Sequence, residues 1–434
     1  MPAPSPKAPP VPPLRLRVAV VGGGIAGLSA ARLLARVHDV VVFEAEHRLG
    51  GHAHTHDVTV GGRAYRLDTG FLVFNEKTYP NFVRLLAELG VASAPSDMAL
   101  SIRCRRCRLE YALRGPRSIF AQKKNLLRPA FYGLFRDLGR FFREARAFLD
   151  APIAPSIAGT DLSVGEFLER GGYGTEFVHH WLLPTSGALW SAPFGDIRAY
   201  DARGFLEFFR NHAFLERRQL AWRTVAGASR TYVDAIAKEL GPRVRLGSPV
   251  DRVERDERGV SVVARGSAPE RFDAVVLACH ADDALSMLAD ADARERQVLA
   301  RFRYAHHPAV LHTDRSFLPD ARPAWAAWNC DLEDCRDASA PASLTYYLNR
   351  LQGLSTDTTF CVTLNPHRPP EGVLAEMRYA HPMLTADATR AQRDIEALGG
   401  RGGVHFAGAH LRHGFHEDGV VSGMAAAARL GVSS

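Results

Sequence analysis

The sequence contains no run of about eighteen consecutive apolar residues, so it predicts no membrane-spanning helix. It also lacks a P-loop lysine, a nucleophile-elbow serine and an H-E-x-x-H zinc motif, so kinase and hydrolase chemistry are unsupported. The proline-rich residues 1–13 lack the apolar core of a signal peptide and predict a disordered tail. We therefore expect a cytoplasmic protein.

Cysteine is scarce, with six residues in a chain of 434, which favours a reducing compartment over a disulfide-rich secreted fold. The only close spacing is Cys104-x-x-Cys107. A structural zinc site usually needs a second ligand pair, and the sequence has no second C-x-x-C, so no metal site is predicted. We expect the two thiols at the tip of a surface hairpin; a metal-binding or redox role is the alternative.

The overall composition of the chain is that of a globular protein with excess positive charge. Hydrophobic residues make up 46% and charged residues 23%, and the length suffices for two or three domains. The net charge of +7 indicates an anionic partner, either nucleic acid or a membrane surface.

Residues 16–44 have the pattern of a nucleotide-binding βαβ unit. A short β-branched run leads into three spaced glycines, a helical stretch and a second strand. Gly22 permits the tight turn, Gly24 lets the backbone approach a pyrophosphate, and Gly27 lets the helix pack on the strand. The helix N-terminus attracts phosphate, and Glu44 accepts hydrogen bonds from the adenosine ribose, which also argues against NADP.

The residues that follow this unit select FAD rather than NAD. Residues 48–51, RLGG, resemble the R-x-G-G segment of the flavin amine oxidase and phytoene desaturase superfamily, and residues 68–70, DTG, resemble its D-x-G turn. The resemblance implies FAD as the cofactor. It places Arg48, Gly50 and Gly51 against the pyrophosphate and the isoalloxazine ring, and Gly70 beside the flavin.

Later segments return to the cofactor domain in this superfamily. The strand-like runs at 243–263, 272–279 and 404–408 match those returns. The resemblance places the Val250 backbone against the adenine and makes Gly408 a cofactor contact. A new helix predicted near Gly419 would direct its free N–H groups, with those of Gly419 and Val420, at the pyrimidine edge of the flavin.

The C-terminal segment 414–419, GFHEDG, departs from the common pattern of the superfamily. His416 is the candidate catalytic residue, because histidine titrates near working pH. The alternative is that residues 416–418 cap the helix or lie at the surface. Ala409 stands where most members carry an acid that holds the ribityl or pyrophosphate group, so that contact is lost or supplied elsewhere.

Together these segments predict an α/β fold: a discontinuous Rossmann-like FAD-binding domain with an inserted α+β substrate domain, as in amine oxidases. We expect the FAD-binding domain at 14–75, 225–290 and 395–434, and the substrate domain at 76–224 and 291–394. Within the latter, residues 379–382, YAHP, suit either a pocket wall or ordinary core.

The excess charge lies at 103–146, which holds thirteen Lys or Arg residues and three acids. Aromatic and leucine side chains interleave with these charges at spacings of three and four, as in an amphipathic helix. The segment predicts peripheral binding to an anionic membrane surface, at the inner face of the membrane. The alternative is that the aromatics face the core. Nucleic acid is not predicted as a partner, because no nucleic-acid motif accompanies the charge.

Segments such as 71–82 and 414–419 show a narrower resemblance, to bacterial predicted FAD-binding proteins encoded beside cyclopropane fatty acid synthases. These bacterial proteins are also similar to the flavoprotein segment of the plant cyclopropane fatty acid synthases. The resemblance implies an FAD-dependent oxidoreductase that dehydrogenates (desaturates) a methylated or cyclopropane-type acyl chain of a membrane phospholipid. A fatty acid methyltransferase or cyclopropane synthase is then an expected partner.

Two alternative functions stay open. The first is an amine or amino-acid oxidase. It is disfavoured because such oxidases usually place a lysine near the flavin, whereas this chain has five lysines and none in the late substrate-domain strands. The second is a non-catalytic flavoprotein that acts as the partner of a lipid methyltransferase.

Overall fold

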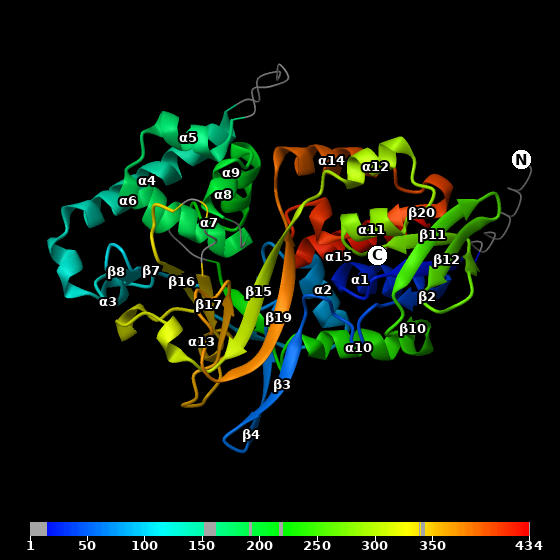
Figure 1. Ribbon diagram of the computed structural model, residues 1–434, viewed down its shortest axis with the longest axis horizontal. Coiled ribbons are helices and arrows are strands. Elements are labelled where there is room, and N and C mark those ends of the chain that lie inside the picture. The colour runs from blue at the N-terminus through cyan, green and yellow to red at the C-terminus, as the bar shows by residue number, and fades with distance from the viewer. Residues whose placement is uncertain are drawn as a thin grey trace, which may run out of the picture.

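The computed structural model describes residues 15–151, 162–190, 193–216, 220–337, 339 and 343–433 (Figure 1). The tail predicted at 1–13 lies outside these residues. Within the described ranges, no helix is both long and apolar enough to cross a membrane.

A five-stranded parallel sheet forms the centre of one lobe, on the right in Figure 1. The strand order is β10-β2-β1-β14-β20, with β1 (Arg17–Val21) in the middle. Its partners are β2 (Asp39–Phe43), β10 (Val244–Arg245), β14 (Ala274–Leu277) and β20 (Val404–Phe406). Three distant parts of the chain therefore build one sheet, which confirms the predicted discontinuous Rossmann-like fold.

The two faces of this sheet are buried against different layers, because side chains alternate along each strand. Val18 and Val20 pack with the helices of one face, and Ala19 and Val21 with the other layer. The first face carries α1 (Ile25–Leu34), α2 (Pro80–Glu88), α10 (Arg230–Leu240) and α15 (His416–Arg429). The second carries β11 (Val250–Asp256), β12 (Gly259–Ala264), β13 (Glu270–Phe272), α11 (Ala281–Met287), α12 (Ala293–Leu299) and α14 (Ala386–Glu396).

This packing differs from the domain ranges given above at three helices. The predicted ranges place α2, α12 and the part of α14 up to residue 394 in the substrate domain, but the buried side chains of these helices belong to the cores of the cofactor sheet. Each of these helices adjoins a predicted boundary, so the packing lengthens the three pieces of the cofactor lobe and leaves the number of crossings between the lobes unchanged. The boundaries themselves stay predictions.

The second lobe is built on a seven-stranded sheet with helices on one face, on the left in Figure 1. The strand order is β19 (Val373–Pro382), β15 (Tyr304–His312), β18 (Cys361–Leu364), β17 (Ser343–Tyr347), β16 (Trp328–Leu332), β7 (Leu100–Cys104) and β8 (Leu109–Ala112). All neighbouring pairs are antiparallel except β16 with β7. The helices are α4 (Pro129–Asp150), α5 (Val164–Gly171), α6 (Thr175–Phe177), α7 (Leu183–Trp190), α8 (Phe194–Arg198) and α9 (Ala202–Asn211), with a π-helical turn, η2 (Val178–Leu182).

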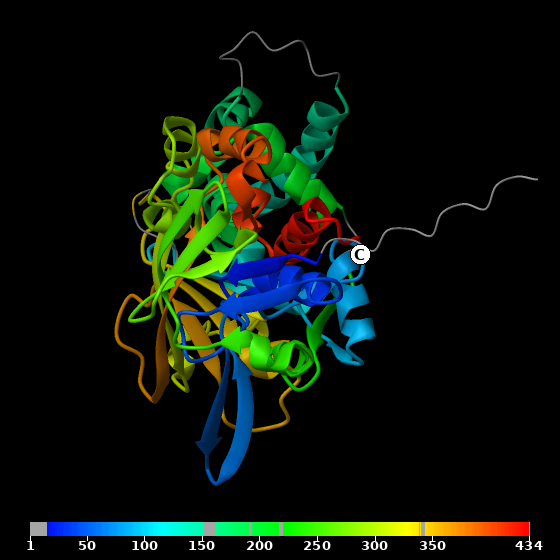
Figure 2. The same ribbon diagram turned by 90° about the vertical axis from the view of Figure 1, so that its right-hand side faces the viewer.

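Smaller elements join the lobes. The hairpin β3 (Thr55–Val60) and β4 (Arg63–Asp68) projects below the molecule in Figures 1 and 2, and β9 (Trp222–Val225) pairs with β5 (Phe74–Asn75) and β6 (Ser93–Pro95). The remaining elements of the described residues are short: α3 (Pro116–Ile119), η1 (Lys123–Leu127), η3 (Gly241–Arg243), η4 (Arg315–Phe317), η5 (Arg322–Ala324), α13 (Leu348–Leu351), η6 (Arg401–Gly403) and η7 (Ala409–Leu411).

The segment 103–146, predicted to be basic and amphipathic, does not fold as one continuous helix. The segment folds as the β7–β8 hairpin, short helical turns and then α4, which begins at Pro129. The apolar face of α4 is turned inward, with Phe131, Leu134 and Phe141 buried, because the lobe needs that face to complete its own core. The large apolar side chains of the segment that stay exposed are Leu126, Leu127 and Tyr132, at 49%, 87% and 48%.

Helix α15 packs directly on α1 through glycines. A Cβ atom added to Gly423 would lie 2.2 Å from the carbonyl oxygen of Ala26. We therefore expect Gly423→Ala to lower the free energy of unfolding by about 1–3 kcal/mol, the usual cost of overpacking. The control is Gly139→Ala in α4, where a Cβ meets no atom within 4 Å and the change should raise helix stability by up to about 1 kcal/mol. Urea unfolding followed by circular dichroism measures both; equal effects would contradict the packing.

Candidate functional site

The turn between β1 and α1 requires glycine for two steric reasons. Gly22 has φ +109°, and a Cβ there would lie 2.6 Å from the carbonyl oxygen of Ala278 on the neighbouring strand's loop. A Cβ on Gly27 would lie 1.9 Å from the Gly22 carbonyl oxygen, so the helix could not pack on the turn. Gly24 differs, since a Cβ there has no neighbour within 4 Å. The backbone at Gly24 therefore faces open space, as a pyrophosphate contact requires.

The N-terminus of α1 is built for an anion. The first intrahelical bond runs from the Leu28 N–H to the Gly24 carbonyl at 2.9 Å, so the N–H groups of residues 25–27 precede it. No acid occupies the first turn of the helix. The positive end of the helix dipole thus adds to these N–H groups, and a phosphate suits the position.

Glu44 lies at the end of β2, beside this turn. Its carboxylate accepts hydrogen bonds from the Gly23 N–H at 2.6 Å and the Glu46 N–H at 2.8 Å. Burial raises the pKa of Glu44 despite these bonds. The Ser248 N–H donates to the Glu44 carbonyl at 2.8 Å, so the chain leading into Val250 and β11 runs next to the acid. The ribose role of Glu44 and the adenine contact of Val250 stay predictions that this proximity favours.

The second glycine pair lies directly on the first turn. The Gly50 N–H donates to the Gly23 carbonyl at 2.8 Å, and a Cβ on Gly51 would lie 3.2 Å from the Gly24 Cα. Arg48 donates to the Gly51 carbonyl at 2.9 Å and pairs with the carboxylate of Glu46, also at 2.9 Å. The loop therefore places a guanidinium and two glycines at the phosphate-binding turn. Its contacts with the cofactor stay predictions.

Gly70 packs on the same loop. A Cβ on Gly70 would lie 2.1 Å from the His52 carbonyl oxygen, and the Phe71 N–H donates to that oxygen at 2.8 Å. The neighbouring Asp68 is buried and accepts hydrogen bonds from the Thr55 hydroxyl and the Ser229 N–H and hydroxyl; burial raises its pKa to about 6. Asp68 thus fixes the start of α10 to the cofactor loop.

The C-terminal helix begins earlier than predicted. Helix α15 starts at His416 rather than near Gly419, and the Gly419 N–H already bonds to the Phe415 carbonyl at 3.1 Å. The free N–H groups therefore belong to residues 416–418, and the prediction that Gly419 and Val420 supply them is wrong. The shift occurs because Asp418 completes a cap with the Phe415 N–H at 2.9 Å. Gly408 donates its N–H to the Ser422 hydroxyl at 2.9 Å.

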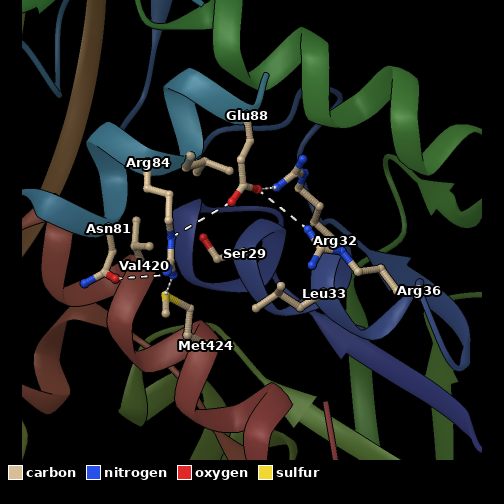
Figure 3. A pocket seen from close by; sticks show the side chains of 10 residues that line it. Ser29, Arg32, Leu33, Arg36, Asn81, Arg84, Glu88, Val420 and Met424 are labelled. Atoms are coloured by element: carbon tan, nitrogen blue, oxygen red, sulfur yellow. Dashed lines mark hydrogen bonds and ion pairs between the residues drawn. The ribbon is translucent and has the colours of Figure 1, made fainter. Parts of the chain in front are cut away.

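The side chain of Val420 is buried and lines a cleft on the outer side of the lobe, between α1, α2 and α15 (Figure 3). Arg32, Arg36 and Arg84 in this cleft all approach the carboxylate of Glu88, at 2.5, 3.6 and 3.9 Å. The cleft contains none of the predicted glycines of the cofactor turn. It is a surface ion-pair cluster and carries no part of the candidate site.

For Glu417 and Asp418, the capping alternative is confirmed. Glu417 accepts hydrogen bonds from the backbone N–H groups of Asn81 and Phe82, at 3.0 and 2.9 Å, and so caps α2. Asp418 caps its own helix, as described above. Both acids are buried for structural reasons, so neither is free to act on a substrate.

His416 lies in an aromatic environment. Its ring stacks on Phe71 at 3.7 Å between centroids, meets Phe82 edge-on at 4.9 Å, and its Nε2 lies 2.9 Å from the Tyr232 hydroxyl. Burial lowers the pKa of His416 to about 3, so the imidazole is neutral and a weak base. These contacts favour a positioning role, and they disfavour the predicted role as the catalytic proton acceptor.

The structure brings together a row of imidazoles that the sequence analysis missed. The ring centroids of His52 and His381 are 5.4 Å apart, and those of His381 and His307 are 5.5 Å apart. Burial lowers the pKa of His52 to about 4, and the pKa values of the other two are also lowered, mainly by burial. In the described part of the chain, His52 Nε2, His381 Nδ1 and His307 Nε2 have no hydrogen-bond partner. Unpartnered buried nitrogens are what a ligand-binding wall would offer.

Tyr379 connects this row to the cofactor loop. Its hydroxyl lies 2.6 Å from the Thr69 hydroxyl, and its ring lies 5.2 Å from that of His52. Strands β15 and β19 pair so that His307 lies opposite Tyr379. Both side chains therefore come from the same edge of the sheet. The only signal in the sequence was the YAHP segment, since the partners lie about three hundred residues apart in the chain.

The four lysines of the described residues, Lys77, Lys123, Lys124 and Lys238, are all exposed. None of them belongs to the imidazole row or to the glycine loops. Arg48, in contrast, lies within the R-x-G-G loop itself. The geometry defines a dinucleotide-binding, two-lobed flavoprotein fold with a wall of histidine and tyrosine rings where the lobes meet.

Comparison with known proteins gives the family. Residues 25–326 match the sequence profile of the flavin containing amine oxidoreductases. The chain belongs to this family, and FAD is its cofactor. A relative from Mycobacterium tuberculosis, named as a flavin-containing monoamine oxidase, is 30% identical over 286 residues; the match covers 61% of this chain and 58% of the relative. The aligned region thus spans little more than half of that relative's length.

Solved structures of the same fold include a cyclohexylamine oxidase from Brevibacterium oxydans, with TM-score 0.68 and 19% identity over 96% of this chain and 99% of that one. A putrescine oxidase variant has TM-score 0.67 and 17% identity, also over 96% and 99%. A fatty acid isomerase from P. acnes has TM-score 0.66 and 16% identity over 95% and 98%. At these identities the likeness establishes the fold, and confirms the predicted amine oxidase-like architecture.

Two valine substitutions separate the roles of the first turn. In Gly24→Val the side chain would enter open space, so we expect a folded protein that binds at least tenfold less FAD. In Gly27→Val the side chain would collide with the Gly22 carbonyl, so we expect loss of both stability and FAD. Thermal unfolding and flavin absorbance measure the two effects. Full FAD occupancy in Gly24→Val would contradict the assignment of the phosphate site.

Proposed function

We propose that this protein is an FAD-dependent oxidoreductase acting on a methylated or cyclopropane-type acyl chain of a membrane phospholipid. The observation that carries the proposal is the wall of rings formed by His52, His381, His307 and Tyr379, in which burial lowers the pKa values of the three imidazoles. A wall of neutral rings suits an apolar substrate, because an unpaired cation or carboxylate there would be costly to desolvate.

Bound FAD supplies the hydride acceptor of the reaction, and oxygen or a quinone would reoxidise it. The chain's own residues orient the substrate and exclude water. Tyr379 offers a hydroxyl and His52 an unpartnered nitrogen at the point where the sheet meets the cofactor loop. The neutral imidazoles can accept hydrogen bonds without introducing charge.

Aromatic side chains also pack across the boundary between the two lobes. Phe208 of α9 stacks on Phe415, which precedes α15, with 4.6 Å between ring centroids, and Trp190 packs on Phe208 at 4.8 Å. Aromatic rings thus reach from the helical layer to the cofactor lobe. One protein of similar fold is a fatty acid isomerase, which supports an acyl chain as the substrate.

An amine oxidase is the second candidate. The family profile and the relative named as a monoamine oxidase favour it, as do the two amine oxidases of similar fold. The wall would also accept a neutral amine beside the His52 and Tyr379 rings, which pack on each other with 5.2 Å between centroids. The exposed positions of the described lysines weigh against this candidate, as the sequence analysis expected.

Anaerobic reduction of the holoprotein distinguishes the candidates. We expect phospholipid vesicles with cyclopropane or methyl-branched acyl chains to bleach the flavin band near roughly 450 nm at least tenfold faster than vesicles with unmodified chains. Mass spectrometry should then find acyl chains that have lost two hydrogen atoms. The Gly24→Val protein, tested with the same vesicles, is the flavin-depleted control.

Other results of the anaerobic reduction would favour one of the two alternative functions. Bleaching by a simple primary amine and by no lipid would replace the proposal with amine oxidation. A flavin that dithionite reduces but neither substrate class reduces would favour the non-catalytic partner of a lipid methyltransferase.

We also propose that the protein binds the inner membrane surface peripherally through a small patch, which we call the leucine patch. It consists of Leu126, Leu127 and Tyr132 with Lys123 and Lys124, all exposed. Apolar side chains that enter the acyl boundary beside lysines that meet anionic headgroups form a common peripheral site.

Binding to vesicles tests the leucine patch. Replacing Leu126 and Leu127 with Ser should weaken co-sedimentation with vesicles containing phosphatidylserine at least tenfold, because each buried leucine contributes about 1.5–3 kcal/mol. The matched control replaces Leu246 and Val373, which are 43% and 45% exposed elsewhere, with Ser and Thr. Equal binding of both variants would contradict the assignment.

A further inference from the structure

Four side chains from three separate segments meet next to the β7–β8 hairpin, at one edge of the seven-stranded sheet. Cys104 and Cys107 come from the β7–β8 hairpin, His180 from the π-helical turn η2, and Cys335 from the loop after β16. One ligand-type atom from each residue lies within 4.8 Å of the other three. The sulfur atoms of Cys107 and Cys335 are 3.6 Å apart.

The size of this cluster fits a tetrahedral metal ion. Zinc–sulfur bonds of about 2.3 Å and zinc–nitrogen bonds of about 2.0 Å place neighbouring ligand atoms roughly 3.5–3.8 Å apart. The measured sulfur–sulfur distance lies in that range, and it is far longer than the roughly 2.05 Å of a disulfide bond. Three thiols and one imidazole form a ligand set that zinc prefers.

His180 is the second, independent observation. Its side chain is only 2% exposed, and its Nδ1 lies 2.5 Å from the carboxylate of Glu176, one helical turn earlier. In the described chain, its Nε2 has no hydrogen-bond partner. A carboxylate that fixes one ring nitrogen so that the other can bind a metal is the usual outer-shell arrangement of zinc-ligating histidines.

The surrounding contacts hold each ligand segment in place. The Tyr111 hydroxyl donates to the His180 carbonyl at 2.7 Å, and His179 Nδ1 lies 2.6 Å from the Cys335 carbonyl. Arg128 donates to the Cys107 carbonyl at 3.3 Å. Its guanidinium offsets the single negative charge that three thiolates leave on a zinc ion. Cys104, His180 and Cys335 are buried, so the site has little contact with solvent.

We propose that Cys104, Cys107, His180 and Cys335 bind one Zn²⁺ in a structural site. All four coordination positions are filled by protein, which leaves none open for substrate or water. The ion would tie the β7–β8 hairpin to η2 and to the loop after β16, at the end of the substrate lobe opposite β1 and β2 (Figure 1). It is therefore independent of the flavin reaction proposed above.

Metal analysis of the full-length holoprotein tests this proposal. Protein produced in medium that contains zinc is first freed of weakly bound metal. Plasma mass spectrometry should then find about one Zn²⁺ per chain. Cys335→Ser and Cys107→Ser should each lose at least nine-tenths of it. Cys361→Ala is the matched control, because Cys361 is fully buried in β18 and belongs to no cluster among the described residues.

A milder variant distinguishes the loss of zinc binding from misfolding of the chain. Glu176→Gln leaves all four ligands in place but removes the carboxylate next to His180, so zinc affinity should fall about 10–100-fold in competition with a chromogenic chelator. Its FAD content, read from the visible spectrum, should equal that of the unchanged protein. A metal-binding defect with normal FAD content supports a positioning role for Glu176.

Two results would overturn the proposal. One is unchanged protein that contains no zinc and whose Cys107 and Cys335 are joined by a disulfide in peptide mass spectrometry. The other is zinc that Cys335→Ser and Cys107→Ser retain at the level of Cys361→Ala.

Discussion

Close backbone contact at one turn is the constraint on which the rest of this structure depends. Gly22 must lie against the loop after β14, Gly27 against Gly22, and Gly51 against Gly24, each within van der Waals distance. Side chains at the first two positions would push the segments apart. The turn and the R-x-G-G loop belong to the first piece of the cofactor lobe and the loop after β14 to the second, so this contact joins two of its three pieces. It also leaves the open space at Gly24 where a phosphate fits.

The same contact sets the chemistry of the site where the lobes meet. The R-x-G-G loop continues into His52, which lies beside His381 and Tyr379 of the second lobe. Desolvation keeps the imidazoles neutral, and the nearby acids Asp68, Glu417 and Asp418 are held by backbone N–H groups. An oxidation that takes a hydride from an uncharged substrate suits such surroundings better than one that begins with ion pairing.

The sequence predicted what depends on local pattern and missed what depends on distant contacts. The βαβ unit, the glycines and the discontinuous fold follow from short motifs whose geometry is local. The start of α15 was predicted three residues late because Asp418 caps it through its own side chain. Spacing alone left open whether the aromatics at 103–146 face a membrane or the core, and the burial of Phe131 and Phe141 supports the core alternative for these two. The ligands Cys107 and Cys335 are 228 residues apart, so no spacing rule could pair them.

The flavin content of the purified chain tests whether the glycine turn binds FAD. Mild denaturation should release FAD into solution, at about one molecule per chain, with no flavin left on the polypeptide. Chromatography of the released cofactor identifies it, and the absorbance at roughly 450 nm before denaturation gives its amount. A chain that carries no flavin, or one that carries NAD in its place, would contradict the assignment of the glycine turn and everything built on it.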